Sequence, residues 1–460
     1  MERKSPYTWR RILPAVLLFS FSESATTQED TLLGRDHILW ESSAEISEEQ
    51  SGLIVAGVGD LDADGFGDIA VGMPGHDGRG DDAGAVLVIS GRTGDTLHLL
   101  FGRRARDRFG HAVAGAGDVN QDGFDDLIVG APGVENDKGA AYVFSGKKGD
   151  ERFRVEGEQG GGQLGWSVSS AGDVNFDGSF DVIIGSPGFD GEAGENCGQA
   201  QVISGMTRRK IERLHLWQGM AEGEEFGWSV AGSQYPYRRP SDGECGDDAM
   251  PNTAPYDHGE RQIMVGAPGG RADPHGPRVG LVHIYKGREG TLVKTLMGRS
   301  RDDRFGNQVT GCGDMNGDSW LDVAVGTDSE NGYIRVFSCR DGRMLRHFRS
   351  PLKHVRFGYS IGGFLDIDQD GFDDLVVGMP GDRQALASGE TTGMPAVLVF
   401  SGRLGKAVFT LPAENPEEHF GCSVASAGDF NGDGFADVIV GADRFEVQPG
   451  FARVYSPRSP

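Results

Sequence analysis

Short runs of β-branched and small apolar residues recur along this chain, and a polar, aspartate-rich loop precedes each of them. The clearest copy is GDVNQDGFDDLIVGAP from Gly117, where the run after Asp126 is too short for a helix. Such a run is typical of a buried strand. FGHAVAGAGD from Phe109 predicts a strand before the loop, and GAAYVFSG from Gly139 and RFRVEG from Arg152 predict two strands after it. Each unit is therefore expected to contain four short strands.

The unit is repeated around the chain at intervals of roughly 60 residues. The first aspartate of the loop occurs at Asp60, Asp118, Asp173, Asp314, Asp366 and Asp429. The wide interval between the third and fourth loops has room for one more unit, which FGWSVAGS from Phe226 opens and RQIMVGAPGG from Arg261 continues. Seven such units predict an all-β fold, a seven-bladed β-propeller with calcium loops between strands one and two of six blades.

The two ends of the repeat region are expected to meet. The last unit stops after ARVYSP from Ala452 and lacks a fourth strand, whereas Ile38–Glu41 aligns with the fourth strand of a unit that has no other strands. We expect this segment to pair with the last blade and close the ring, which removes an open sheet edge. The propeller is accordingly placed at residues 34–456.

The loops offer oxygen ligands and no Cys or His, which is the set that a hard cation such as calcium prefers. Side-chain oxygens stand at loop positions 1, 3, 5 and 9, while position 12 is apolar, so the loop is not an EF-hand. About six calcium ions are expected. The candidate ligands, with position 7 included, are Asp60, Asp62, Asp64, Phe66, Asp68; Asp118, Asn120, Asp122, Phe124, Asp126; Asp173, Asn175, Asp177, Ser179, Asp181; Asp314, Asn316, Asp318, Trp320, Asp322; Asp366, Asp368, Asp370, Phe372, Asp374; and Asp429, Asn431, Asp433, Phe435, Asp437.

The net charge of −25 at pH 7 has the same origin, because many of the acidic residues belong to these loops. Six calcium ions would return about 12 positive charges. The chain has no basic patch, so a nucleic-acid partner is not expected. We expect a monomer.

The N-terminus predicts export. Residues 1–11 carry Arg3, Lys4, Arg10 and Arg11, residues 12–21 are apolar, and small residues follow. This pattern is that of a signal peptide over residues 1–25 and is too short to span a membrane. The mature protein is therefore expected to be secreted or periplasmic, with no membrane span.

The fourth unit carries an insertion at residues 233–262 in place of the acidic loop. Long loops in compact domains are often functional, although a decorative insertion remains an equal alternative. Its candidate recognition residues are Tyr235, Tyr237, Arg238, Arg239 and Tyr256.

One catalytic pattern is present but lacks its context. Gly358, Ser360 and Gly362 match the GxSxG nucleophile elbow, which requires a strand, a turn and a helix. Ser360 instead aligns with Ser167 as a repeat position on strand one, so we interpret it as structural.

These repeats resemble FG-GAP repeats, as in the propeller of integrin α chains and of glycosylphosphatidylinositol-specific phospholipase D. Phe109-Gly110, Gly130-Ala131-Pro132 and the DxNxDGxxD loop between them carry the resemblance. The resemblance implies a calcium-bound propeller that acts as a binding or adhesion module for an extracellular protein or glycan, and we expect it not to be an enzyme. The alternative is a secreted polysaccharide lyase or hydrolase that uses the propeller face, for which the sequence shows no converging acid–base groups.

Overall fold

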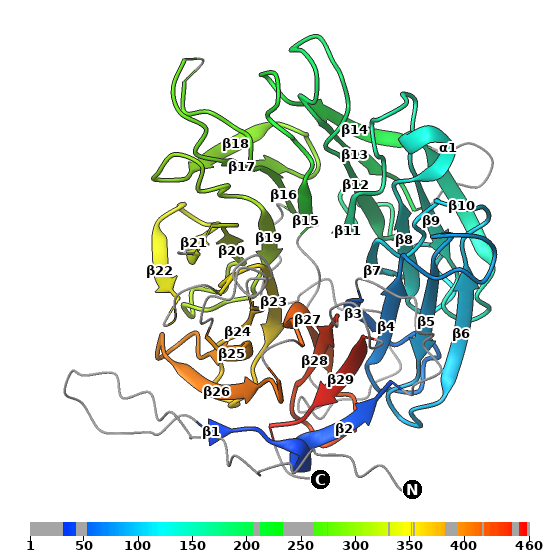
Figure 1. Cartoon of the computed structure of the whole chain (residues 1–460), viewed down its shortest axis with the longest axis vertical. Helices are drawn as coiled ribbons and strands as arrows, with labels where there is room; N and C mark the ends of the chain where they lie inside the picture. Colours follow the sequence, from blue (N-terminus) through cyan, green and yellow to red (C-terminus); the bar gives the residue numbers. More distant parts are fainter. Residues whose placement is uncertain are drawn as a thin grey trace, which may run out of the picture.

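The structure is a computed structural model that describes residues 31–42, 53–205, 212–232, 261–273, 275–329, 332–350, 352, 355–381, 393–415, 418–443 and 450–457. Seven sheets are arranged around a central axis in these ranges, and each sheet has at least four strands (Figure 1). The predicted seven-bladed propeller is confirmed.

The strands follow one another from the axis to the rim in each blade. Blades one to three contain β3 (Ile54–Gly59), β4 (Asp68–Met73), β5 (Ala85–Ile89), β6 (Thr96–Phe101); β7 (Ala112–Gly117), β8 (Asp126–Ala131), β9 (Ala140–Phe144), β10 (Glu151–Glu156); and β11 (Ser167–Gly172), β12 (Asp181–Ser186), β13 (Gln199–Ile203), β14 (Arg213–Gln218). Blades four and five contain β15 (Ser229–Gly232), β16 (Gln262–Ala267), β17 (Leu281–Lys286), β18 (Leu292–Met297); and β19 (Gln308–Gly311), β20 (Asp322–Gly326), β21 (Tyr333–Ser338), β22 (Met344–Arg349). Blades six and seven contain β23 (Ser360–Leu365), β24 (Asp374–Met379), β25 (Ala396–Phe400), β26 (Ala407–Pro412); and β27 (Phe420–Gly428), β28 (Asp437–Ala442), β29 (Phe451–Tyr455). The short helical turns are η1 (Arg35–His37) and α1 (Val134–Asp137).

Burial explains the composition of each strand. The inner strands contact one another across the blade boundaries, and a Cβ added at Gly57 would lie 2.1 Å from the carbonyl oxygen of Ser426 in the neighbouring blade. The second strands, such as β4 and β8, are buried along their whole length, which accounts for their continuous apolar runs. Between blades the core includes the fully buried aromatic rings of Phe109, Phe226 and Phe420.

The N-terminal segment fastens the ring, as expected for Ile38–Glu41. This segment is β2, which pairs antiparallel with β29 so that Trp40 faces Val454. A second contact was not predicted: β1 (Thr31–Leu32) pairs parallel with β26 and gives blade six a fifth strand. Both strands run along the rim beside blades six and seven (Figure 1).

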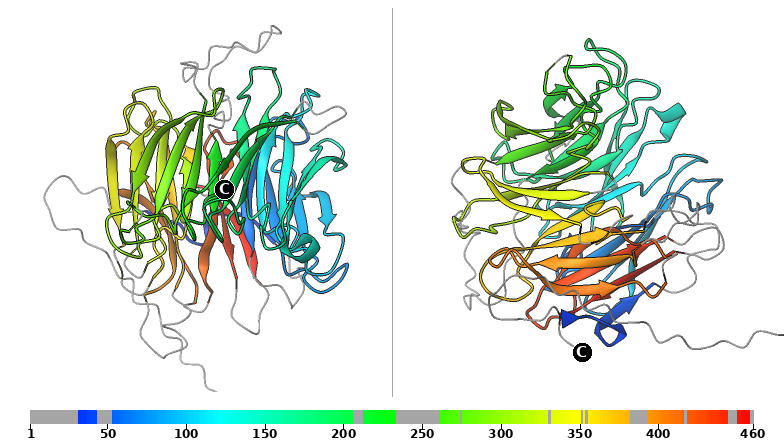
Figure 2. Two further views of the ribbon diagram at one scale, coloured as in Figure 1. Left: turned by 90° about the horizontal axis from the view of Figure 1, so that it is seen from above. Right: turned by 60° about the vertical axis from the view of Figure 1, so that its left-hand side comes forward.

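The antiparallel order divides the connections between two faces of the ring. Connections from strand one to two and from three to four lie at one face, and connections from two to three and from four to the next blade lie at the other face. Figure 2 shows the blades edge-on between these faces. The acidic loops therefore share one face, which we call the loop face, and we call the other the partner face.

Candidate metal loops and the opposite face

The last carboxylate of each acidic loop is at the first residue of strand two and is fully buried. In blade one the Oδ2 atom of Asp68 accepts the N–H of Leu61 at 2.8 Å, and its Oδ1 atom accepts the N–H of Gly91 at 3.0 Å. Gly91 belongs to the connection between β5 and β6. In all six loops the carboxylate at position 9 accepts a hydrogen bond from the backbone N–H of position 2. The donors are Leu61, Val119, Val174, Met315, Ile367 and Phe430.

The first carboxylate folds the loop around itself. Asp60 accepts the N–H groups of Asp64 and Gly65 at 3.0 and 2.8 Å, and Asp64 accepts the N–H of Phe66 at 3.0 Å. The loop can turn this tightly because Gly65 has a φ of +92°, which favours glycine. Backbone donors thus hold positions 1, 5 and 9 before any ion binds.

Two loops bring three carboxylates together. One oxygen each from Asp60, Asp62 and Asp68 lies within 4.8 Å of the others, and Asp366, Asp368 and Asp374 form the same arrangement in blade six. The Oδ1 atom of Asp62 is buried and has no hydrogen-bond partner among the described residues. Such an orphaned acceptor beside two other carboxylates fits a cation ligand.

Position 3 is asparagine in the other four loops, and its amide has a different role in two of them. Asn120 donates its Nδ2–H to Asp126 at 2.8 Å, and Asn316 donates to Asp322 at 3.0 Å. The amide nitrogen rather than the oxygen therefore faces position 9. If the side-chain amide rotates by half a turn, its oxygen takes the place of its nitrogen, and an ion could then bind that oxygen.

The predicted residues at position 7 do not offer a side-chain ligand in blades one, two and six. Lys147 lies 4.0 Å from the ring centroid of Phe124, and Arg92 and Arg403 lie over Phe66 and Phe372 in the same manner. A phenyl ring has no oxygen to offer a hard cation, and these rings make cation–π contacts instead, so only the main-chain carbonyl of position 7 is available to a metal.

The loops carry unfavourable negative charge in the absence of a cation. Burial, with smaller contributions from the charges of Asp62 and Asp60, raises the pKa of Asp68 to about 7. Burial likewise raises the pKa of Asp374 and of Asp437 to about 8. A bound cation would offset both the burial and the repulsion. The residues of these loops therefore fit a hard divalent ion.

The partner face has an aromatic cluster that the sequence analysis missed. A Gly precedes the inner strand in these blades, at the partner face. The residue that follows this Gly is His111 in blade two, Trp166 in blade three, Trp228 in blade four and Tyr359 in blade six, and all four are partly exposed. The ring centroids of His111 and Trp166 are 4.5 Å apart, and those of Trp166 and Trp228 are 4.9 Å apart. The detectable signal was the position after Phe-Gly or Leu-Gly, where three of these four residues carry large aromatic rings. We call His111, Trp166 and Trp228 the aromatic cluster, whereas the Tyr359 ring contacts His419, with the ring centroids 6.1 Å apart.

One guanidinium group lies against Trp228 of the aromatic cluster, and another lies against Tyr359. Arg304 is 4.8 Å from the Trp228 ring and pairs with Glu225, while Arg356 is 4.4 Å from the Tyr359 ring and pairs with Asp328. Burial lowers the pKa of His111 to about 4, so its imidazole is neutral at physiological pH. The partner face thus combines aromatic rings with cations.

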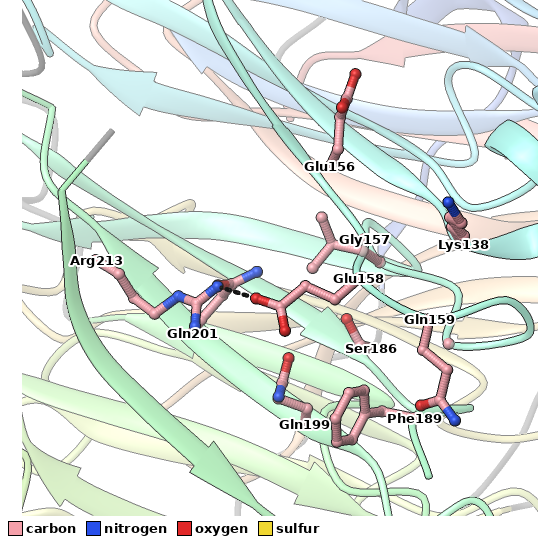
Figure 3. Close-up of a pocket in the computed structure, with 12 residues that line it drawn as sticks. Lys138, Glu156, Gly157, Glu158, Gln159, Ser186, Phe189, Gln199, Gln201 and Arg213 are labelled. Atoms are coloured by element: carbon pink, nitrogen blue, oxygen red, sulfur yellow. Dashed lines mark hydrogen bonds and ion pairs between the residues drawn. The ribbon is translucent and has the colours of Figure 1, made fainter. Parts of the chain in front are cut away.

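A polar cleft of about 250 Å³, which includes its solvent-open part, lies between blades two and three (Figure 3). Gln199 and Gln201 line its floor, and the ion pair of Arg213 with Glu158, at 2.8 Å, crosses it. The internal ion pair occupies much of the polar capacity of the cleft. We assign no function to it.

Ser360 occupies a structural position, as its alignment suggested. It lies in strand β23, and its Oγ accepts the N–H of Val424 in the next blade at 2.9 Å. Ser423 makes the same contact with Val55 of blade one. The GxSxG match is thus part of the inter-blade hydrogen bonding.

Several predicted features lie outside the described residues. They are the signal peptide at residues 1–25 and the recognition residues Tyr235, Tyr237, Arg238, Arg239 and Tyr256 of the insertion. Over the described ranges, no helix has the length and apolar character needed to cross a bilayer.

Seven blades, six of which have an acidic loop before the second strand, are typical of an FG-GAP repeat propeller. Residues 109–144, 164–202 and 420–455 match the family described as FG-GAP repeat. The chain is thus an FG-GAP repeat protein that resembles the propeller of integrin α chains.

Curated relatives agree with this assignment. Phosphatidylinositol-glycan-specific phospholipase D of Bos taurus is 28% identical over 385 residues, which cover 75% of this chain and 45% of that protein. Integrin alpha-5 of Xenopus laevis is 34% identical over 28% of this chain and 14% of its own length. Integrin alpha-3 of Cricetulus griseus is 33% identical over 56% of this chain and 24% of its own length. The chain spans less than half the length of each of these relatives.

The expectation that the protein is not an enzyme is wrong as an inference from the repeats. An enzyme, the phospholipase D, is among the relatives and matches 75% of the chain. The expectation rested on the absence of a catalytic constellation from the propeller sequence. Because propellers of this kind also match part of an enzyme, the repeats alone do not distinguish an enzyme from a binding protein.

Proposed function

We propose that this protein is an extracellular calcium-binding propeller that binds a protein partner. The observation that carries the proposal is the convergence of Asp60, Asp62 and Asp68, and of Asp366, Asp368 and Asp374, on one point in each loop. Calcium is the preferred ion because it takes six to eight oxygen ligands in flexible geometry. Positions 1, 3, 5 and 9 and the position 7 carbonyl of each loop would hold it, with about six ions in total.

The ions would stabilise the blades rather than create them, because backbone N–H groups already hold the loops in shape. Each site filled to about 100 times its Kd would add about 2.7 kcal/mol to the free energy of unfolding. Calcium is abundant outside the cytoplasm, and the basic and apolar pattern of residues 1–25 supports export.

The partner face supports a protein ligand. Trp, Tyr and Arg are enriched where protein interfaces are most strongly bound, and the aromatic cluster with Arg304, together with Tyr359 and Arg356, has this composition. The resemblance to integrin α chains favours adhesion as the context. A glycan ligand is the contrasting possibility, because stacked aromatic rings also bind sugars.

Calcium binding can be tested directly. Isothermal titration of the chelator-treated protein should show several binding sites, and the melting temperature should fall when calcium is removed. Asp68→Asn should remove one site, whereas Asp81→Asn, in an exposed connection of the same blade, should leave all sites intact. Identical melting with calcium and with chelator would contradict the proposal.

Partner binding requires a second experiment. Immobilised extracellular proteins and a glycan array are screened with the labelled protein in calcium. Binding to a protein should be lost in Trp166→Ala and retained in Trp217→Ala, because Trp217 stacks on Tyr285 away from the aromatic cluster. Binding restricted to glycans would contradict the protein-partner proposal while leaving the calcium result intact.

A further inference from the structure

Three side chains of different chemistry meet at the partner face of blade seven. His419 precedes strand β27, Cys422 lies within it, and Asp443 follows strand β28. One ligand atom from each lies within 4.8 Å of the others, and the Nδ1 atom of His419 is 2.7 Å from the Oδ1 atom of Asp443. The acidic loop of blade seven joins the other ends of these two strands, so this group is separate from the candidate calcium sites.

Strand register brings the group together. Phe420 pairs with Ala442, which makes His419 and Asp443 the next opposed residues beyond the sheet. The N–H of Cys422 donates to the carbonyl of His419 at 3.2 Å, and this turn places the thiol on the same side. The backbone pairing, rather than a chance approach of long side chains, therefore sets the positions of these three residues.

Blade seven departs from the repeat at these positions. Asp443 stands where Pro132 follows the Gly-Ala pair in blade two. Blade five also replaces that proline, with Asp328, but there the Nε–H of Arg356 donates to the carboxylate at 2.9 Å and neutralises it. Asp443 lies beside an imidazole and a thiol, which are both metal ligands.

Burial and chemistry favour an ion over a simple hydrogen bond. His419 is 7% exposed and Asp443 is 8% exposed, while Cys422 is partly exposed and forms no disulfide. The Nε2 atom of His419 is buried without a hydrogen-bond partner among the described residues. In the 2.7 Å contact the Nδ1–H of His419 donates to the Asp443 carboxylate, which accepts. A metal ion would displace this proton and bind Nδ1, the carboxylate and the thiolate together.

We propose that Nδ1 of His419, Sγ of Cys422 and Oδ1 of Asp443 form a binding site for Zn²⁺. Sulfur, nitrogen and oxygen together are the ligands that zinc takes, whereas calcium selects oxygen alone. Tetrahedral coordination needs ligand atoms about 3.3–3.8 Å apart, so the three atoms require only small side-chain shifts. The fourth position faces the partly exposed side of Cys422 and would take water or a ligand group from outside the chain.

The test uses the full mature protein saturated with calcium, so that the oxygen-rich loops are filled. Cobalt is added as a spectroscopic substitute for zinc. We expect one equivalent of Co²⁺ to give the near-ultraviolet absorption of a thiolate-bound ion, and one equivalent of Zn²⁺ to remove it. Absence of this absorption overturns the proposal.

Variants assign the ligands. Cys422→Ser should abolish the absorption, and Asp443→Asn should weaken zinc binding at least about tenfold. Cys197→Ser, which alters another free cysteine in blade three, should leave both unchanged. Near-ultraviolet circular dichroism checks that each variant folds, and Asp443→Asn carries the test if Cys422→Ser does not fold. Absorption that persists in Cys422→Ser, zinc affinity unchanged in Asp443→Asn, or absorption lost in Cys197→Ser overturns the assignment.

Discussion

Asp60 and Asp125 bind each other across the boundary between blades one and two through two hydrogen bonds. The N–H of Asp60 donates to the Oδ2 atom of Asp125 at 3.0 Å, and the N–H of Asp125 donates to the carbonyl of Asp60 at 3.2 Å. Asp314 and Asp373 repeat the arrangement between blades five and six, at 2.8 and 3.0 Å. The first ligand position of one acidic loop is thus held by the neighbouring loop.

Asp125→Ala should weaken this boundary. The variant leaves the N–H of Asp60 without its acceptor, and we expect a loss of about 1–3 kcal/mol in the free energy of unfolding. Denaturant unfolding in calcium measures this loss. Asp125→Asn retains an acceptor oxygen and serves as the matched control, with a smaller expected loss. Equal stability of the alanine variant and the wild type would show that the contact contributes little.

Gly59→Ala should be more damaging than Gly65→Ala, although both glycines have positive φ, of +84° and +92°. A Cβ at Gly59 would lie 2.1 Å from the Oδ2 atom of Asp125, whereas no atom lies within 4 Å of a Cβ at Gly65. Gly65→Ala should therefore cost about 1–2 kcal/mol for its backbone alone. Thermal melting of the two variants in calcium compares them, and an equal effect would contradict the role of the inter-blade contact.

Stability without calcium should decrease as the pH rises. Burial raises the pKa of Asp126 to about 7 and of Asp322 to about 8, well above the unfolded value near 4. A carboxyl group whose pKa is higher in the folded state stabilises the fold below the unfolded pKa, and this contribution is lost as the pH rises through the folded pKa. The melting temperature in chelator should thus fall between about pH 5 and pH 8.

Calcium should reverse this trend, because its ligands must be deprotonated. The increase in melting temperature on adding calcium should become larger from pH 5 to pH 8, and the affinity measured by titration should rise over the same range. The difference between the two conditions isolates the loops, since other carboxylates titrate in both. A calcium effect that is independent of pH would contradict the assignment of these buried aspartates as ligands.

Removing the N-terminal strands should open the ring. Deletion of residues 31–42 together with the preceding segment removes β1 and β2 and leaves buried Arg453 with Glu414 but without Glu41, its partner at 2.8 Å. We expect the melting temperature to fall by about 5–10 °C, from the lost strand pairing and the loss of one of the two carboxylates that pair with Arg453. Deletion of residues 1–30 alone keeps both strands and is the control. Equal melting of the two truncated proteins would show that closure adds little stability.

The repeat made most of the fold predictable. Aligning the units located the inner strands, the acidic loops and the closing strand Ile38–Glu41, because each is a property that many blades share. Departures from the repeat were harder to interpret. The contact of β1 with β26 joins residues far apart in the sequence, and a two-residue strand has no periodicity to detect.

The candidate sites show the same difference between features that the repeat shares and features that depend on neighbouring elements. Positions 1, 3, 5 and 9 of the loops follow from local spacing, and the structure places them as one folded loop. The role of Asp125 depends on the neighbouring blade, and the meeting of His419 with Asp443 depends on strand register. A single repeat unit contains neither relationship. Tertiary neighbours, rather than composition, determine these contacts.

The fastening of β2 to β29 reverses the order of synthesis. Residues Ile38–Glu41 leave the ribosome before any blade, yet their partner Phe451–Tyr455 is made last. A nascent chain must therefore keep its earliest strand unpaired while the blades fold one after another. Translation that stops before β29 yields an unfinished circle with an exposed strand, the kind of surface that chaperones and proteases recognise. The circle therefore closes only after β29 has been made, whatever the order in which the other blades fold.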